Sequence, residues 1–186
     1  MMVPPRSPFV WQYPSVTNLE MIAGVRLEQL QSHPDSRGTF TEIFRRSWPT
    51  GVNPVQWNVV RSAPGVMRGV HVHPVHDDYL ALVAGRATVG LCDLRPGAST
   101  SGLTLEMDGL APTALTIPHG VAHGFLFHEQ SMHVYATSEY FGAADELGCR
   151  WDDPKLGIPW PVSKVMLSPR DEGLPALAEL RRQLPW

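Results

Sequence analysis

The 186-residue sequence is poor in lysine and cysteine and has no long apolar run. Only two of its 15 basic residues are lysines, Lys155 and Lys164, and both lie late in the chain. The two cysteines, Cys92 and Cys149, form neither a CxxC motif nor a disulfide framework, which favours a cytoplasmic protein. No stretch approaches the roughly 18–20 apolar residues of a membrane span, so we expect no membrane partner.

A strong charge of one sign is also absent, because 15 basic residues face 18 acidic ones and the net charge is −3. This balance argues against a nucleic-acid partner. Hydrophobic residues make up 43% of the chain and charged residues 18%, which is typical of a globular protein. We expect one domain over residues 16–186, preceded by an arm over residues 1–15. In that arm the alternating Phe9, Trp11 and Tyr13 could add an edge strand to a partner.

Long helical patterns are nearly absent, whereas 18 prolines and 16 glycines are spread along the chain. Short apolar stretches alternate with turn signals, which predicts an all-β sandwich or barrel. Two strands are expected around Gly85, and residues 124–127 and 133–137 are expected to pair with each other. A helix is predicted only over residues 174–183, because Leu177, Leu180 and Leu184 form an apolar stripe there. Further strands are expected over residues 25–30, 39–44 and 114–117.

Histidine is clustered, since seven of the eight histidines lie between His71 and His133. His71 and His73 are two residues apart, so on a strand both imidazoles share one face. Asp78 follows a turn-like segment, and His123 follows a tight turn, so a closed barrel can bring both beside the first pair. These four residues make a plausible site for a divalent transition metal with open positions. They could equally line a pocket as hydrogen-bonding groups.

The same residues carry a resemblance to the cupin signature. From Gly65 to Gly85 the chain has glycine, five residues, His-x-His, four residues, a carboxylate, six residues and glycine. Asp78 stands where cupins usually have glutamate. The second motif, Pro-x-Gly-x-x-His, ends at His123, and Phe127 replaces its usual asparagine. The resemblance implies a cupin-type jelly-roll β-barrel, here with a short C-terminal helix.

Over residues 20–175 the chain resembles one cupin branch more closely, the dTDP-4-dehydrorhamnose 3,5-epimerases. The resemblance implies an isomerase that epimerises a nucleotide-linked 4-keto-6-deoxy sugar at C3, C5 or both, with no cofactor. The matching stretches are 35–42 (DSRGTFTE), 56–62 (QWNVVRS), 66–71 (VMRGVH), 117–125 (IPHGVAHGF), 135–140 (YATSEY), 150–154 (RWDDP), 156–161 (LGIPWP) and 167–171 (LSPRD).

The resemblance also implies the roles of individual residues in catalysis. The chemistry needs a base and an acid on opposite faces of the sugar ring. His71 is implied as the base, oriented by Asp171, and Tyr135 as the acid. Arg68 and His123 are implied to contact the sugar or to stabilise the enolate oxygen. Taken alone, Asp171 is better explained as a helix cap.

Nucleotide binding is implied for a second group of residues. Arg37 can pair with the diphosphate as a planar fork, and Phe40 and Tyr140 are implied to sandwich the thymine base. In the family the strand that carries residues 37–42 crosses to a neighbouring subunit, which implies a homodimer with shared sites. The implied polar contacts come from Glu42, Gln56 and Asn58.

The sequence departs from the family at three positions near the expected site. Where the family typically has a lysine close to the sugar's 4-keto oxygen, this chain has Asp78. Where glutamine commonly follows the base by two residues, it has His73. A family tyrosine after Tyr140 is replaced by Phe141.

The first two departures complete the potential metal set of His71, His73, Asp78 and His123. Two catalytic hypotheses follow: an epimerase with a modified pocket, or a metal-dependent cupin enzyme in which His71 is a ligand and not a free base. A third possibility is a non-catalytic sugar-binding cupin.

Overall fold

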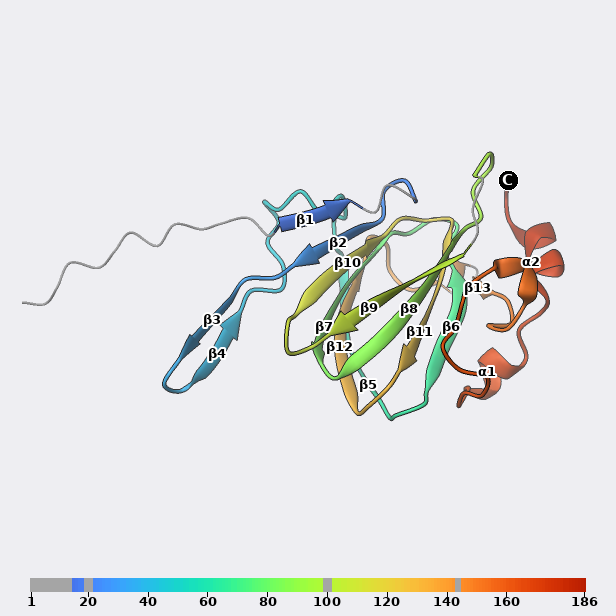
Figure 1. Ribbon diagram of the computed structural model, residues 1–186. Coiled ribbons are helices and arrows are strands. Elements are labelled where there is room, and N and C mark those ends of the chain that lie inside the picture. Colours follow the sequence, from blue (N-terminus) through green and yellow to red (C-terminus); the bar gives the residue numbers. More distant parts are fainter. Residues whose placement is uncertain (1–14, 19–21, 99–101, 143–144) are drawn as a thin grey trace, which may run out of the picture.

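The computed structural model describes residues 15–18, 22–98, 102–142 and 145–186. The arm residues Phe9, Trp11 and Tyr13 lie outside the described residues. Within these ranges two antiparallel sheets face each other and form a jelly-roll β-barrel (Figure 1), which confirms the expected fold class. None of the helices in the described ranges is long and apolar enough to cross a membrane.

Strands that are distant in sequence alternate within each sheet. The first sheet contains, in spatial order, β1 (Ser15–Asn18), β2 (Arg26–Gln29), β10 (Thr113–Ile117), β7 (Asp78–Ala84), β12 (Ser131–Thr137) and β5 (Gln56–Ser62). The second contains β13 (Leu147–Gly148), β6 (Met67–Val72), β11 (Val121–Phe127), β8 (Arg86–Asp93) and β9 (Leu103–Asp108). Each sheet therefore draws on both halves of the chain, and the residues of the two sequence motifs meet between them.

The two strands expected around Gly85 are present as β7 and β8. Gly85 has φ +83°, and a Cβ built there would lie 2.2 Å from Ser131 Oγ, so the turn requires glycine. The expected pairing of residues 124–127 with 133–137 is wrong. β11 pairs with β6 and β8, whereas β12 pairs with β5 and β7. The short segment between β11 and β12 crosses from one sheet to the other instead of closing a hairpin.

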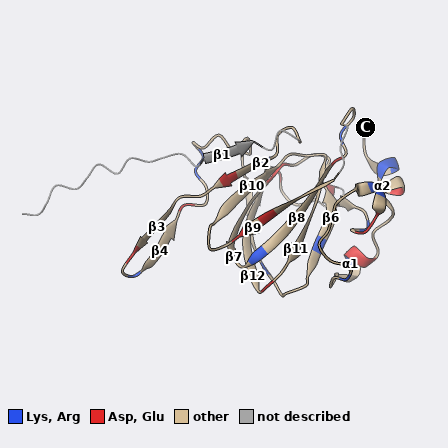
Figure 2. Cartoon of the chain, viewed as in Figure 1, with Lys and Arg blue, Asp and Glu red and all other residues tan. Residues whose placement is uncertain are grey.

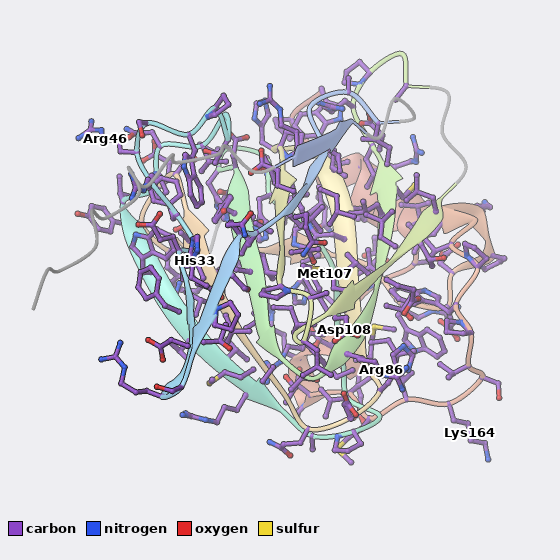
Figure 3. All side chains as sticks on the ribbon, turned by 60° about the vertical axis from the view of Figure 1, so that its left-hand side comes forward. His33, Arg46, Arg86, Met107, Asp108 and Lys164 are labelled. Carbon is purple, nitrogen blue, oxygen red and sulfur yellow. The ribbon has the colours of Figure 1, made fainter. Side chains whose placement is uncertain are left out.

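The main core lies between the two sheets, where apolar side chains from both inner faces are buried. Leu82 and Leu115 come from the first sheet, and Leu91 and Phe127 from the second. Figure 3 labels Met107 of β9, which is 2% exposed and belongs to the same cluster. Alternating inward residues of the two sheets therefore produce this core.

The outer face of the second sheet is covered by the C-terminal segment, which contains the 3-10 turn η2 (Pro154–Leu156), α1 (Pro169–Glu172) and α2 (Leu177–Gln183) (Figure 1). Leu177, Leu180 and Leu184 are buried there, which confirms the predicted apolar stripe. The helix begins at Leu177 rather than at residue 174. The earlier residues include Gly173, the C-cap of α1, and Pro175, which cannot donate a helical backbone hydrogen bond.

A hairpin of β3 (Ser32–Asp35) and β4 (Gly38–Thr41) projects away from the barrel (Figure 1). The strand expected over residues 39–44 ends at Thr41. Figure 2 shows basic and acidic residues interspersed along the described chain, as the balanced composition suggests.

Candidate active site

A cavity of about 270 Å³ lies between the two sheets. It is lined from the first sheet by side chains of β5, β7, β10 and β12, and from the second by β6 and β11. The segment around α1 closes one side of it. Most of the histidine cluster faces this cavity, so the fold brings both sequence motifs to one place.

His71 lies on β6 and contacts Asp171 of α1, one hundred residues later in the chain. His71 Nε2 is 2.7 Å from Asp171 Oδ1, and the Asp171 side chain is only 5% exposed. Ser168 caps α1 by accepting a hydrogen bond from the Asp171 backbone N–H at 3.1 Å, so Asp171 lies inside the first turn and does not cap it. Because Nε2 is held by the carboxylate, Nδ1 is the ring nitrogen that remains for other chemistry.

The Asp171 carboxylate is held in its charged form. Burial acts against ionisation, but the hydrogen bond and charge of His71 outweigh it and lower the pKa of Asp171. Close backbone packing supports this position: Gly148 pairs with His71 in the register of β13 and β6. A Cβ built on Gly148 would lie 2.6 Å from the Val70 carbonyl oxygen, so only glycine permits this approach.

Tyr135 lies on β12, in the sheet opposite His71, and also lines the cavity. Burial, with the negative charges of Asp78 and Glu146, raises the pKa of Tyr135 above its ordinary value. The phenol therefore stays protonated at neutral pH and can donate a proton. The cavity thus has a histidine on one sheet and a protonated tyrosine on the other.

Arg68 is held at the cavity wall by two hydrogen bonds. Its Nε donates to Ser62 Oγ at 2.9 Å, and its Nη2 donates to the Arg61 carbonyl at 3.3 Å. His123 lies beside His71, since the two residues pair in the register of β11 and β6. Burial lowers the pKa of His123 to about 4 despite the nearby carboxylate, so this ring is neutral at pH 7. Both residues implied to stabilise an enolate therefore line the same cavity.

His73 and Asp78 meet His123 in one corner of the cavity. His73 Nε2 is 3.5 Å and His123 Nε2 is 3.6 Å from the same oxygen, Asp78 Oδ2. The turn after β6 therefore returns the Asp78 carboxylate to the histidines, as expected from the sequence. His71 is not part of this group, because its Nε2 contacts Asp171.

His76 is a cavity residue that the sequence motifs did not indicate. Its Nδ1 is 2.5 Å from Asp145 Oδ2, and its Nε2 is 3.6 Å from Asp78 Oδ1. Burial opposes protonation of His76, but the two carboxylates outweigh it and raise its pKa to about 9. Burial also acts against ionisation of Asp78, yet the interaction with His76 and the neighbouring imidazoles lowers its pKa. The signal in the sequence was the spacing of two between His76 and Asp78.

His133 and Arg170 also line the cavity without having been picked out from the sequence. His133 stacks on Phe127 with ring centroids 5.4 Å apart, and its Nδ1 is buried without a hydrogen-bond partner. Burial, with the charge of Arg68, lowers the pKa of His133 to about 4. Arg170 pairs with Glu146 at 3.1 Å.

Three residues expected to bind the nucleotide lie on or next to the projecting hairpin, and none of them lines this cavity. Arg37 pairs with Asp35 at 2.6 Å, and Phe40 is 60% exposed. Glu42 pairs with Arg45 at 2.7 Å. The hairpin extends away from its own barrel (Figure 1), in keeping with the absence of these three residues from the cavity lining.

The remaining expected contacts divide between the cavity and its surroundings. Gln56 lines the cavity, and its Oε1 accepts a hydrogen bond from the Phe141 backbone N–H at 3.1 Å. Asn58 pairs with Tyr135 in strand register but is not among the lining residues. Tyr140 is 75% exposed, while the neighbouring Phe141 lines the cavity.

Neither lysine contributes to the cavity. Lys155 and Lys164 are both exposed, and Figure 3 shows Lys164 pointing outward at the edge of the molecule. The positive charges in the cavity wall therefore come from arginine and histidine.

The sequence profile of dTDP-4-dehydrorhamnose 3,5-epimerases matches residues 20–179. The chain belongs to this family. The dTDP-4-dehydrorhamnose 3,5-epimerase of Sinorhizobium fredii is 33% identical over 171 residues, which cover 86% of this chain and 88% of the relative. That of Escherichia coli is 34% identical over 164 residues, covering 80% and 86%. The protein is therefore an enzyme, an isomerase of the carbohydrate epimerase type.

Solved structures give the same result for the fold. NovW, a 4-keto-6-deoxy sugar epimerase from Streptomyces spheroides, has a TM-score of 0.84 at 29% identity and covers 96% of this chain and 97% of its own. The 3,5-epimerase of Legionella pneumophila, solved with dTDP-4-keto-L-rhamnose, has a TM-score of 0.82 at 28% identity and covers 90% and 97%. The 3'-monoepimerase ChmJ of Streptomyces bikiniensis has a TM-score of 0.79 at 30% identity and covers 88% and 89%.

Proposed function

We propose that this enzyme epimerises a dTDP-linked 4-keto-6-deoxy sugar, inverting C3, C5 or both, in deoxysugar biosynthesis such as that of rhamnose. One observation carries the proposal: the His71–Asp171 pair and the protonated Tyr135 face one cavity from opposite sheets. Family membership supports the substrate class, and the NovW and ChmJ relatives show that the fold also serves related sugars and a single inversion.

The base in this proposal is His71 Nδ1. A C–H bond beside the 4-keto group is acidic because its electron pair can move into the carbonyl and form an enolate. Nδ1 takes the proton, and the resulting imidazolium is stabilised by the Asp171 carboxylate 2.7 Å from Nε2. Asp171 also fixes the tautomer in which Nε2 carries the hydrogen and Nδ1 has the free electron pair.

The acid in this proposal is Tyr135. Its hydroxyl gives a proton to the opposite face of the enolate carbon, and the electron pair of the enolate forms the new C–H bond. Because Tyr135 and His71 come from facing sheets, proton removal and proton return occur on different faces of the ring, and the carbon is inverted. The two transfers use side chains only and require no cofactor.

The negative charge on the enolate oxygen needs positive or hydrogen-bonding groups nearby. Arg68 serves this purpose in the proposal, because two hydrogen bonds already orient its guanidinium at the cavity wall. His123 acts as a neutral neighbour of the sugar. This assignment leaves the buried His73–Asp78 corner without a part in the proton transfers.

The nucleotide end of the substrate is assigned to the hairpin of a second subunit. Arg37, Phe40 and Glu42 lie on or beside a hairpin that extends away from its own barrel, so we assign them to the partner's cavity in a homodimer. Arg37 pairs with the diphosphate there, and Phe40 with Tyr140 encloses the thymine ring. Gln56 and Asn58 supply the remaining polar contacts. We also assign the enzyme to the cytoplasm, in keeping with the free cysteines Cys92 and Cys149.

Solvent exchange tests the reaction directly. The enzyme is incubated with dTDP-4-keto-6-deoxyglucose in deuterated water, and deuterium at C3 and C5 is followed by NMR. Exchange with inversion at one or both carbons is the expected result, and the exchanged positions define a mono- or di-epimerase. No exchange at either carbon, for this sugar and for analogues on other nucleotides, would overturn the proposal.

Subunit complementation tests the shared site. Arg37→Ala and His71→Ala chains are each expected to be nearly inactive as homodimers. After mixing, unfolding and refolding, a hybrid dimer has one cavity with both an intact His71 and an intact hairpin from its partner. Recovery of activity in the mixture supports the crossed arrangement, whereas a mixture no more active than its components contradicts it.

A further inference from the structure

Three buried side chains converge on one point at the edge of the cavity: His73, Asp78 and His123. Their closest approaches to the shared Asp78 oxygen, 3.5 Å and 3.6 Å, exceed the roughly 2.7–3.2 Å of a hydrogen bond. In a tetrahedral site each ligand atom lies about 2.0–2.1 Å from the metal ion, so two ligand atoms are about 3.4 Å apart. The two nitrogen–oxygen distances match this separation. The three ligand atoms all lie within 4.8 Å of one another, so they can surround one ion, while neither imidazole is close enough to Asp78 to share a proton with it.

The other nitrogen of each imidazole is already held by the backbone. His73 Nδ1 lies 3.0 Å from the Asp145 carbonyl oxygen, and His123 Nδ1 lies 3.1 Å from the Val121 carbonyl oxygen. A carbonyl oxygen only accepts, so in each neutral ring Nδ1 carries the hydrogen and Nε2 points its lone pair toward Asp78. Metal-binding histidines are oriented in this way by hydrogen bonds from their second nitrogen.

Negative charge is in excess around these rings. The carboxylates of Asp78, Asp145 and Glu146 each lie within 3.6 Å of an imidazole nitrogen. Arg170 pairs with Glu146, and the protonated His76 lies between Asp145 and Asp78, so three carboxylates face two cations in this part of the described structure. A divalent cation would balance this charge, and the lone pairs of Nε2 would face it instead of a carboxylate.

We propose that His73, Asp78 and His123 bind one divalent first-row transition-metal ion, with its open coordination positions toward the cavity. Two imidazoles and one carboxylate are the donors of zinc and non-haem iron sites. Magnesium is a poorer match, because it prefers oxygen ligands and retains its water.

This site differs from the four-residue set that the sequence suggested, because His71 is bound to Asp171 and stays free to act as a base. Metal binding and proton abstraction can therefore coexist in one cavity. The binding site stands on the geometry alone. Its use rests on the proposed function: the ion would polarise an oxygen of the bound sugar, supplying positive charge that the two exposed lysines do not.

Cobalt titration of the full-length, tag-free protein after chelator treatment tests the site. Saturable binding of one Co²⁺ per chain is expected. The bound ion should show visible d–d absorption bands typical of a low-symmetry site. Elemental analysis after zinc loading should give the same stoichiometry. Asp78→Asn and His123→Gln should each weaken Co²⁺ binding at least about 100-fold. Circular dichroism checks that each variant is folded, and the two variants alter different strands.

Two matched variants define the ligand set. Asp77→Asn changes the neighbouring carboxylate, which instead contacts His119 Nδ1 at 2.8 Å, and should bind Co²⁺ like the wild type. His71→Asn should also bind Co²⁺ with an unchanged spectrum, although it lacks the proposed base. Loss of binding in His71→Asn would overturn the ligand assignment in favour of a site that includes His71.

The metal proposal and the proposed function fail separately. Absence of a stoichiometric ion, or Asp78→Asn binding as tightly as wild type, overturns the proposed metal site. Solvent exchange at C3 or C5 is unaffected by that result. Conversely, stoichiometric Co²⁺ without any exchange on the sugar panel overturns the reaction and leaves the metal site in place.

Discussion

Two histidine–carboxylate groups face the same cavity, and they differ chiefly in distance. In the His71–Asp171 pair nitrogen and oxygen are 2.7 Å apart, which is a charge-assisted hydrogen bond. In the His73–Asp78 pair they are 3.5 Å apart, and a second imidazole approaches the same oxygen. The first spacing leaves room for a proton alone, and the second leaves room for a larger cation.

Two histidines in one cavity can have different chemistry, because their hydrogen-bond partners differ. His71 and His73 are two residues apart and both contact an aspartate. His71 Nε2 contacts Asp171 of α1, which closes one side of the cavity, whereas His73 Nδ1 contacts a backbone carbonyl. The group that holds the remote nitrogen determines whether the near nitrogen accepts a proton or a metal.

Removing the base should have the largest effect on the reaction. His71→Asn is expected to lower deuterium exchange at both carbons by about 10²–10⁴-fold, the usual contribution of a general base. Exchange rates measured by NMR test this, with His128→Gln as a control because that exposed histidine lies outside the cavity lining. If His71→Asn exchanges deuterium at the wild-type rate, His71 is not the base.

The same isosteric change at the two aspartates should separate the two groups. Asp171→Asn keeps its shape but loses the charge that orients His71 and stabilises the imidazolium, so kcat should fall about 100-fold with KM little changed. Its Co²⁺ binding should match that of the wild type. Asp78→Asn, by contrast, should weaken Co²⁺ binding at least about 100-fold. Steady-state kinetics and cobalt titration are measured on both variants, and a loss of Co²⁺ binding in Asp171→Asn would contradict the division.

Replacing the acid should uncouple proton removal from inversion. Tyr135→Phe keeps the ring that packs against the core but has no proton to give, so His71 still removes protons. Deuterium exchange with retention is expected, while the rate of inversion falls by about 100-fold, the lower end of the usual contribution of a general acid. NMR of the recovered sugars separates the two outcomes. Equal loss of exchange and inversion would show that Tyr135 takes part in proton removal as well.

The smallest effect is on stability, and it depends on pH. The Asp171 pKa is lowered in the fold, so its carboxylate stabilises the folded state above the pKa of about 3.9 in an unfolded chain. Asp171→Asn should therefore be less stable by about 1–3 kcal/mol at pH 7, the range for a lost hydrogen bond to a charged group. The difference should shrink as pH falls through the lower, folded pKa. Urea unfolding at pH 7 and pH 3 measures it, and a gap that widens in acid would reverse the assigned shift.

Local spacing and turn signals predicted an all-β sandwich or barrel, and the resemblance to the cupin signature implied the jelly roll in which the two histidine motifs meet. The prediction failed at the connection after β11, where a short polar segment typical of a hairpin passes between sheets. Long-range packing in the barrel determines which strands pair. A short polar segment looks the same in sequence whether it closes a hairpin or connects two sheets, so the pairing of β11 could not be predicted from it.

The sequence also could not divide the histidines between two tasks. The contact between Asp171 and His71 could be predicted only from the family resemblance, because one hundred residues separate the two in sequence. Asp145, whose carbonyl orients His73 and whose carboxylate contacts His76, belongs to no motif. Such contacts arise from how an irregular loop packs onto the barrel, and no periodic pattern records them.

The two-sheet core has a consequence for stereochemistry. In the proposed reaction the base stands on one sheet and the acid on the other, so the thickness of the packed layer between them, set by side chains such as Phe127 and Leu91, fixes the gap that the sugar ring must bridge. A core residue that never touches the substrate can thus tune how often a proton returns from the face it left. In the proposed reaction, inversion fidelity would therefore depend on barrel packing as well as on the catalytic groups.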